Sequence, residues 1–187
     1  MKSDEISVYF CYLLRHKPEE AHLAMDEHGW VDFEEFVSNV NTYGKYTVTA
    51  DDIIKIVETD QKSRYKLDIQ DGVIKRIKCC QGHSIPWVTP ELTFTAPPDQ
   101  LYHGTTENAY QKILKSGKID KMSRHAVHTH PDLTLAWQSA RRRKLPAVVL
   151  VIDAKKMAED GYRFGVTENG VWCIDEIPVE YISDVLR

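Results

Sequence analysis

The stretch at residues 101–105 combines an apolar start with His103, Gly104 and Thr105, just before a predicted helix. A strand that breaks at a glycine lets a flat ligand approach the backbone closely, and the flanking histidine and hydroxyl can fix its orientation. An ordinary strand-to-helix turn with a surface histidine accounts for the same residues. The stretch is therefore a candidate binding edge, and the rest of the chain must decide between binding and an ordinary turn.

Three cationic side chains in the first third of the chain could bind an anion. Arg15 and His16 end a predicted helix just before Pro18, and Arg64 opens a predicted strand. As capping cations, Arg15 and His16 would stabilise the helix by roughly a few tenths of a kcal/mol, and Arg64 could be a solvated strand end. Taken one at a time, these structural roles are simpler explanations than catalysis.

A second group of cations lies in residues 122–130, which contain Arg124, His125, His128 and His130. Metal binding is one hypothesis for them, but no Cys, Asp or Glu ligand pattern surrounds the histidines. The four cysteines lack a C-x-x-C spacing, which argues against a zinc site and a disulfide framework. We therefore expect no metal ion, and we expect reduced, partly buried thiols.

The elements that must position these residues belong to a globular protein. With 187 residues, 42% hydrophobic and 28% charged, the chain suits one large or two small domains. No apolar run approaches the roughly 18 residues of a membrane helix, and the acidic start lacks the pattern of a signal peptide. We expect a cytoplasmic protein with no membrane partner.

The net charge of −4 does not indicate nucleic-acid binding through a strongly basic domain. An RNA partner would have to be held at a local site. Basic candidates are Lys75, Arg76 and Lys78, and the run at residues 141–144. A solvated helix face is the simpler explanation of the run.

The first half of the chain predicts helices followed by a hairpin. Apolar residues repeat at helical spacing in residues 6–14, 33–44 and 50–57. The period then changes to two at residues 65–69 and 73–77, on either side of a turn. This order predicts a small winged-helix-like module, which we place at residues 1–85.

The second half predicts an α+β domain. Residues 86–100 lose periodicity and gather prolines, so we expect a linker there and a second domain at 101–187. Helices are expected at about 106–117 and 134–144, and strands at 147–152, 162–166, 171–174 and 179–182. Many short strands with few helices indicate α+β architecture. No Rossmann glycine pattern, P-loop or G-x-S-x-G elbow is present.

Eight short motifs occur in order along nearly the whole chain, at residues 14–18, 29–31, 62–65, 81–84, 101–105, 124–128, 146–150 and 168–172. In this set the chain resembles the NAD-dependent RNA 2′-phosphotransferases, which remove the 2′-phosphate left at a tRNA splice junction. The resemblance implies an N-terminal winged-helix-like lobe joined to a C-terminal ADP-ribosyltransferase-like lobe. It also implies that NAD is a consumed co-substrate and that no metal is required.

The resemblance implies a reaction in two steps. The RNA 2′-phosphate attacks the nicotinamide ribose and expels nicotinamide, and the ribose 2″-hydroxyl then attacks that phosphate. The catalytic cluster would consist of Arg15, His16, Arg64 and Arg124. The arginines would bind the phosphate and its transition state, while His16 would position phosphate or ribose or move a proton.

By the same resemblance, His103, Gly104, Thr105 and His128 belong to the NAD site. Val171 occupies the place where many protein-modifying relatives carry a catalytic glutamate, which would repel an anionic phosphate acceptor. Glu168 is close in sequence and leaves room for a shifted glutamate.

The chain departs from the expected pattern in two places, at Thr129 and His130 and at Cys79 and Cys80, which stand before the motif at residues 81–84 where a basic or small residue is more usual. Thr129 and His130 replace the usual leucine and serine, and either could take the place of that serine beside the nicotinamide ribose. His83 could contact a ligand or satisfy backbone groups as a linker histidine.

The expected activity is transfer of the internal 2′-phosphate of RNA to NAD, giving 2′-hydroxyl RNA, nicotinamide and ADP-ribose 1″,2″-cyclic phosphate. Two alternatives stay open: an ADP-ribosyltransferase that caps nucleic-acid phosphates, and a non-catalytic module that binds RNA or ADP-ribose. The expected partner is 2′-phosphorylated, tRNA-like RNA, and the expected state is a monomer. The physiological bearer of the phosphate does not follow from the sequence.

Overall fold

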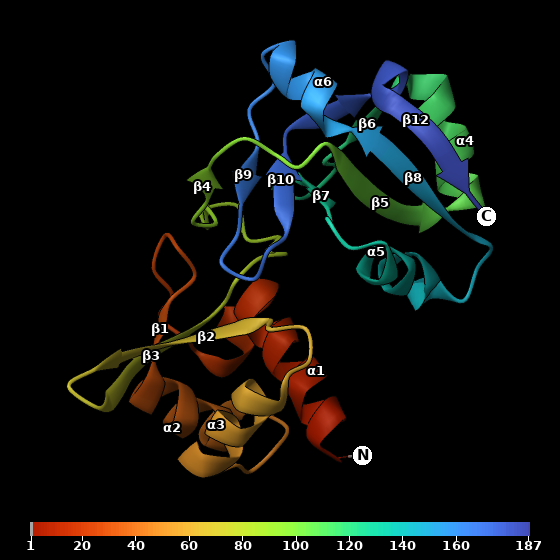
Figure 1. The fold of residues 1–187 in the computed structure, drawn as a ribbon. Coiled ribbons are helices and arrows are strands. Elements are labelled where there is room, and N and C mark those ends of the chain that lie inside the picture. The colour runs from red at the N-terminus through yellow and green to blue at the C-terminus, as the bar shows by residue number, and fades with distance from the viewer. Residues whose placement is uncertain (1) are drawn as a thin grey trace. The chain divides into compact units, whose positions relative to one another are not determined.

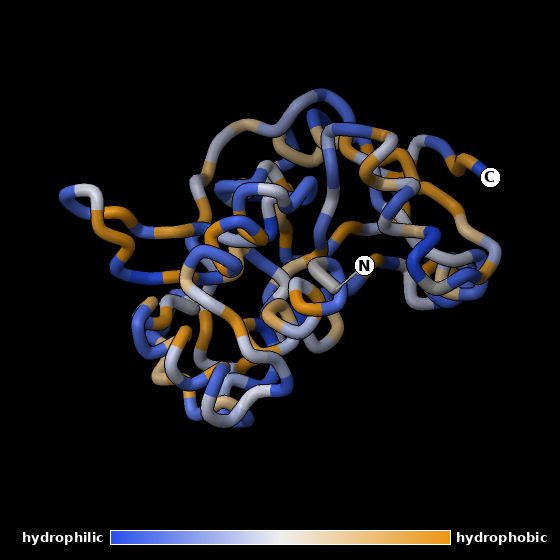
Figure 2. Tube along the Cα trace, turned by 90° about the horizontal axis from the view of Figure 1, so that it is seen from below, coloured by the Kyte–Doolittle hydropathy of each residue, from blue (hydrophilic) through white to orange (hydrophobic). Residues whose placement is uncertain are grey.

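The computed structural model describes residues 2–187, which divide into two compact units that meet in sequence between Glu91 and Leu92. Among the described residues no helix is long and apolar enough to cross a membrane. Figure 2 agrees, because short hydrophobic stretches alternate with hydrophilic ones along the whole trace. Each unit buries a hydrophobic core of its own.

The first unit contains the helices and the hairpin that the sequence predicts. Its helices are α1 (Lys2–Arg15), the 3-10 helix η1 (Pro18–Ala21), α2 (Phe33–Tyr43) and α3 (Ala50–Thr59), and its strands are β1 (Val31–Asp32), β2 (Tyr65–Gln70) and β3 (Val73–Cys79). The strands form an antiparallel sheet in the order β1-β3-β2, and Figure 1 shows α2 and α3 below the β2–β3 hairpin.

Local sequence explains where these elements begin and turn. The Asp32 carboxylate accepts a hydrogen bond of 2.9 Å from the Glu35 amide and caps α2, while Thr49 and Asp52 form a capping box on α3. Asp71 and Gly72 both have positive φ, which the tight hairpin turn requires. The apolar faces of all three α-helices then meet the sheet in one core, which includes Phe10, Leu13, Phe36, Ile53 and Ile77.

The second unit is built from short antiparallel strands. Its strands are β4 (Thr93–Phe94), β5 (Gln100–Thr106), β6 (Lys118–Asp120), β7 (Val127–Thr129), β8 (Ala147–Asp153), β9 (Gly165–Val166), β10 (Trp172–Ile174), β11 (Glu176–Pro178) and β12 (Ile182–Leu186). Its helices are α4 (Glu107–Ser116), α5 (Leu133–Ala140), the 3-10 helix η2 (Arg141–Arg143), α6 (Ala154–Glu159) and the 3-10 helix η3 (Val179–Tyr181).

Three sheets organise this unit, in the orders β12-β8-β5, β4-β9-β10-β7 and β11-β6. Figure 1 shows β5, β8 and β12 side by side, with α5 close to β5. The prediction of α+β architecture is confirmed, because every strand pair is antiparallel and the helices are few and separate.

The predicted break of the strand at Gly104 is wrong. Strand β5 continues through Gly104 to Thr106, whose hydroxyl then caps α4. A Cβ built on Gly104 would lie 2.0 Å from the Ala136 carbonyl oxygen and 2.9 Å from the Ala140 amide nitrogen, both in α5. Glycine is required here because α5 packs directly on the strand, and not because the chain turns.

Other element boundaries also differ from the predictions. The helix expected at 134–144 ends at Ala140 and continues only as η2, after which Lys144 adopts a left-handed φ of 52°. The strand expected at 179–182 is mostly η3, which begins after Pro178. Part of the expected linker forms β4, which pairs with β9. Helix ends and isolated two-residue strands depend on tertiary contacts that periodicity does not report.

Candidate functional site

Arg15 lies at the end of α1 with an incompletely satisfied guanidinium. Its Nε and one terminal nitrogen are buried and have no hydrogen-bond partner among the described residues. The group packs on the backbone of Gly82, whose φ is +89° and whose built Cβ would lie 3.6 Å from the Arg15 Cζ. Burial works to lower the pKa of Arg15, but the Cys79 and Cys11 thiols beside it raise that pKa overall. Buried donors without partners are suited to the oxygens of an anion.

His16 follows directly and is tied to the motif at residues 81–84. Its Nδ1 lies 2.9 Å from the Ser84 hydroxyl oxygen, and the Ser84 amide donates a 2.9 Å hydrogen bond to the Arg15 carbonyl. The imidazole is exposed, so it is available to a substrate. Two motifs about seventy positions apart in the chain therefore meet at the end of α1.

Arg64 is held by a carboxylate that sequence reasoning did not single out. Asp60 accepts hydrogen bonds from the Arg64 amide (2.5 Å), Nε (2.9 Å) and Nη2 (2.5 Å). Burial raises the pKa of Asp60, but the hydrogen bonds from Arg64 outweigh it and the pKa is lowered overall. The Asp60 side chain is only 2% exposed, whereas that of Arg64 is 26% exposed. In the sequence, the only indication of this ion pair is that Asp60 and Arg64 are four residues apart just after a helix.

His83 is a packed interior residue of the first unit. It is 1% exposed, and its Nε2 would lie 2.8 Å from a Cβ on Gly29, which has a φ of +82°. Gly29 and His83 come from two different motifs. Because the His83 ring packs against Gly29, a side chain at position 29 would clash with the ring. This burial favours the structural alternative for His83 over direct ligand contact.

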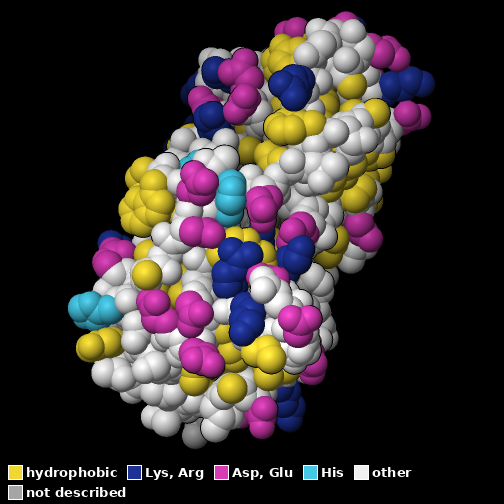
Figure 3. Space-filling view, turned by 90° about the vertical axis from the view of Figure 1, so that its left-hand side faces the viewer, with side chains coloured by type: hydrophobic (Ala, Val, Ile, Leu, Met, Phe, Trp, Pro, Cys, Tyr) yellow, Lys and Arg dark blue, Asp and Glu magenta, His cyan; other side chains and the backbone are white. Residues whose placement is uncertain are grey.

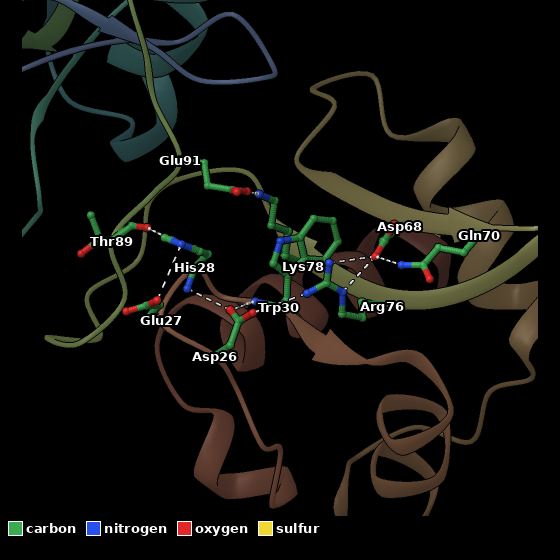
Figure 4. Close-up of polar contacts among 10 residues, drawn as sticks. All are labelled: Asp26, Glu27, His28, Trp30, Asp68, Gln70, Arg76, Lys78, Thr89 and Glu91. Carbon is green, nitrogen blue, oxygen red and sulfur yellow. Dashed lines mark hydrogen bonds and ion pairs between the residues drawn. The ribbon is translucent and has the colours of Figure 1, made fainter.

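Trp30, from the same motif as Gly29, organises a cluster of ion pairs (Figure 4). The Arg76 guanidinium lies 4.8 Å and the Lys78 ammonium 4.5 Å from the Trp30 ring centroid. Arg76 also pairs with Asp68 at 2.8 Å, and Lys78 pairs with Glu91. Since Lys78 is 2% exposed and paired with Glu91, it is not available for the local RNA contact suggested for this cluster, whereas the Arg76 side chain is 44% exposed.

The basic run at 141–144 has exposed side chains at Arg141, Arg142 and Lys144, as predicted for a solvated face, but it lies beyond the end of α5. It forms η2, where the Arg141 guanidinium lies 4.8 Å from the Trp137 ring centroid and Arg142 donates a 2.9 Å hydrogen bond to the Ser139 hydroxyl. The side chain of Arg143 lies outside the described residues. Figure 3 shows acidic and basic side chains intermixed on the face that it displays.

An open cavity of about 550 Å³ lies in the first unit, away from the motifs. Its lining consists of Asp4, Glu5, Val8, Tyr9, Tyr12, Lys45 and Tyr46. Two carboxylates against one ammonium make it unfavourable for a phosphate, so we do not assign the candidate chemistry to it.

In the second unit, His103 on β5 has a defined tautomer. Its Nδ1 lies 2.9 Å from the His128 carbonyl oxygen, and because a carbonyl only accepts, Nδ1 carries the proton. Burial lowers the pKa of His103, and the charge of Arg124 acts in the same direction, against the hydrogen bond to His128. The neutral ring therefore presents Nε2 as an acceptor, which suits a sugar hydroxyl.

Arg124 and His128 are neighbours. The Arg124 Nη1 lies 3.4 Å from the His128 Nδ1, and since arginine only donates, this nitrogen of His128 accepts. His130 joins the same group through paired backbone hydrogen bonds with Tyr102 of 2.8 and 2.9 Å. Burial, together with the charge of Arg142, lowers the pKa of His130.

Alternation along β5 separates the residues of the predicted binding edge. His103 and Thr105 share one face of the strand, and Gly104 faces α5 on the other. Thr129 is fully buried, and its hydroxyl donates to the Trp172 carbonyl at 3.2 Å. Val171 is buried in a small cluster with Ala126 and Cys173.

Within residues 2–187, no three His, Cys, Asp or Glu side chains lie close enough together to hold a metal ion. The site residues therefore form two groups. In the first unit Arg15 and His16 are adjacent, and the charges of Arg15 and Arg64 both lower the pKa of Cys11. In the second unit the group consists of His103, Thr105, Arg124, His128 and His130.

Comparison with known proteins points to one family. A family model described as RNA 2′-phosphotransferase, Tpt1 / KptA family, matches residues 1–176. The chain is 41% identical over 179 residues to a probable RNA 2′-phosphotransferase of Rhizobium leguminosarum bv. trifolii, covering 96% of this chain and 92% of the relative. Proteins of the same name from Burkholderia pseudomallei and Nostoc punctiforme are 38% and 35% identical, over 95% and 97% of this chain and 92% and 96% of their own lengths.

Proposed function

The chain belongs to the RNA 2′-phosphotransferase family, and from that premise we propose which of its residues carry the reaction. It is an enzyme that transfers the internal 2′-phosphate of RNA to NAD and releases nicotinamide and ADP-ribose 1″,2″-cyclic phosphate. The family does not favour a capping ADP-ribosyltransferase or a non-catalytic binding module. The observation that carries the residue assignment is Arg15, whose buried donors have no partner among the described residues.

Arg15, Arg64 and His16 bind the 2′-phosphate in this proposal. Arg64 is aimed by Asp60, and Arg15 is aimed by its packing on Gly82, so both guanidinium groups are oriented before substrate arrives. Preorganised cations cost little reorganisation during the reaction, which is how they lower a barrier. The planar fork of arginine matches two phosphate oxygens at once.

The first step requires positioning more than proton transfer. The attacking phosphate is already anionic, and nicotinamide leaves as a neutral group, so no general base is needed. Holding the phosphate close to the ribose carbon supplies most of the rate enhancement of this step. The burial of Val171 is compatible with this chemistry, because no carboxylate is required at its position.

The second step places developing charge on phosphate oxygens and removes a proton from the ribose 2″-hydroxyl. Arginines stabilise that charge, and the proposal counts Arg124 among them. The exposed His16, oriented by the Ser84 hydroxyl, is the residue that moves the proton or positions the phosphate.

His103, Thr105 and His130 hold NAD in this proposal, with His128 and Arg124 beside them. The Nε2 of neutral His103 accepts a hydrogen bond from a ribose hydroxyl, and the His128 carbonyl keeps that nitrogen aimed. Between the two replacements for the usual serine, we choose His130. Thr129 is buried and its hydroxyl is already used by the backbone of Trp172. Gly104 supports the site through its packing on α5.

The finer architecture and setting are part of the same proposal. The first unit is winged-helix-like, since three α-helices are followed by a hairpin, and the second is ADP-ribosyltransferase-like. We place the domains at 1–85 and 101–187, with the connection at 86–100. The proposed setting is a cytoplasmic monomer that acts on tRNA-like RNA from splicing, with no metal in the reaction.

Incubating the full chain with NAD and an oligonucleotide carrying one internal 2′-phosphate tests the function. The expected products are 2′-hydroxyl RNA, nicotinamide and the cyclic phosphate, in equal amounts. An oligonucleotide with a terminal 5′-phosphate is the matched control. Stable ADP-ribosylated RNA would instead support the capping reaction, and binding without NAD consumption would support the non-catalytic module.

A further inference from the structure

Two thiols in the first unit lie in contact, and the charges of Arg15 and Arg64 reach one of them. The sulfur atoms of Cys11, on α1, and Cys79, at the end of β3, are 4.0 Å apart. Both are free thiols, and they are 8% and 1% exposed. The Cys11 sulfur also lies 3.1 Å from the Tyr65 hydroxyl oxygen, whose proton is directed to the Ser7 carbonyl. The pair is not used by the reaction described above.

The position of the pair connects it to both arginines. Cys11 precedes Arg15 by one turn of α1. Cys79 stands opposite Tyr65 in the β2–β3 ladder, and Tyr65 follows Arg64 in the chain. A covalent link between the two sulfurs would therefore join α1, which ends in Arg15, to β3, the strand that pairs with β2 just after Arg64.

The two thiols differ in reactivity. A hydrogen bond from Cys79 and the charges of Arg15 and Arg64 lower the pKa of Cys11, although burial opposes them. Burial raises the pKa of Cys79. Since the thiolate is the reactive form, Cys11 is the thiol that attacks the oxidant. Cys79 is the resolving thiol, which attacks the oxidised Cys11 sulfur.

We propose that Cys11 and Cys79 form a site of reversible oxidation by hydroperoxides, which closes to a disulfide and slows phosphate transfer. The Cys11 sulfur attacks one peroxide oxygen, the O–O bond breaks, and one water leaves when the peroxide is hydrogen peroxide. The resulting sulfenic acid is attacked by the Cys79 sulfur, the S–O bond breaks, and a second water leaves. Two thiols and one hydrogen peroxide thus give one disulfide and two waters, and a dithiol reductant reverses the change.

Disulfide formation disturbs Arg15 for a geometric reason. The sulfurs must approach by about 2 Å from their present 4.0 Å to reach bonding distance. That movement shifts the last turn of α1 against β3 and removes the Cys79 thiol from the Arg15 guanidinium. Because a misplacement of about 1 Å can cost on the order of 100-fold in rate, we expect at least a tenfold loss of activity.

The first test uses the reduced full chain and hydrogen peroxide. The expected results are the loss of two hydrogens in mass, a Cys11–Cys79 peptide under non-reducing digestion, and a rate of 2′-phosphate transfer that falls in parallel. Dithiothreitol should restore the original mass and the original rate and remove the Cys11–Cys79 peptide. The rate measurement rests on the proposed function, whereas peptide mapping does not, so the two failures are distinguishable.

Cysteine variants give the matched controls. Cys80→Ser leaves the pair intact and should behave like the wild type, although residue 80 is the neighbour of Cys79 in the chain. Cys79→Ala and Cys11→Ala should form no such disulfide, and peroxide should leave each variant at the rate that it had before treatment. Peptide mapping of the wild type decides the case if either alanine variant fails to fold.

Two results would overturn the proposal. One is the absence of a Cys11–Cys79 peptide in wild-type protein whose thiols have been consumed by peroxide. The other is a reversible loss of activity in folded Cys79→Ala as large as in the wild type.

Discussion

Arg64 and Arg124 are proposed to stabilise charge on the phosphate in flight. Replacing either by alanine should lower kcat/KM by about 100-fold or more, as when one preorganised transition-state donor is lost. Arg76→Ala is the matched control, because Arg76 is paired with Asp68 and stacked on Trp30. Single-turnover rates with 2′-phosphorylated oligonucleotide measure the effect. A near-native rate would remove the mutated arginine from the reaction.

Asp60 is expected to act on the reaction through Arg64. Asp60→Asn removes the charge and leaves a poorer acceptor, so the guanidinium loses orientation and the rate should fall by about tenfold. Asp68→Asn changes a carboxylate that pairs with Arg76 instead and should have little effect on rate. The effect of Asp60→Asn should vanish in the Arg64→Ala background, because the two residues act as one unit. Additive losses would contradict this relation.

His103 makes the stability of the fold depend on pH. Its pKa is lowered from 6.5 in the folded chain, so the unfolded chain binds the proton more tightly. This contribution to stability is complete above about pH 6.5 and is lost as the pH falls below it, by up to about 1.4 kcal/mol per pH unit. Denaturant unfolding between pH 7.5 and 5 should show a steeper decline for the wild type than for His103→Gln. If the unfolding free energies of the two proteins fall in parallel with pH, His103 is not held neutral in the folded chain.

At the scale of elements, the contact between β5 and α5 positions the proposed NAD site. Gly104→Ala forces a Cβ against two backbone atoms of α5, so the unfolding free energy should fall by about 3 kcal/mol, the upper end of ordinary overpacking. At Gly117, φ is +79° and a Cβ would meet open space, so Gly117→Ala should cost only about 1 to 2 kcal/mol. Urea denaturation of both variants measures the difference, and equal losses would argue against the close packing.

At the scale of the whole molecule, the net charge of −4 limits how the enzyme binds RNA. If Arg15, Arg64 and Arg124 all bind the 2′-phosphate, which carries at most two charges, the slope of log KM against log salt should be no more than about 1.4, from roughly 0.7 for each neutralised charge on single-stranded RNA. Steady-state kinetics between low and moderate salt with a short 2′-phosphorylated oligonucleotide give the slope. A slope above about 4 would require more phosphate contacts than these three arginines supply.

Several features could be predicted from the sequence because their causes are local or lie in ordered motifs. Helical periodicity and capping residues predicted α1, α2 and α3, and the turn at Asp71 and Gly72 predicted the hairpin. The many short strands predicted α+β architecture. Eight motifs in order predicted the family, which the comparisons confirm.

Other features depended on contacts between distant segments, which periodicity and spacing do not contain. Only the folded chain shows that Gly104 is needed against α5, that Thr129 is buried, and that Asp60 aims Arg64. The same holds for the contact between Cys11 and Cys79, which are 68 positions apart. The sequence alone therefore determined which reaction the residues suit, and the tertiary structure decided which side chains remain available for it, because burial and packing are set by the whole core.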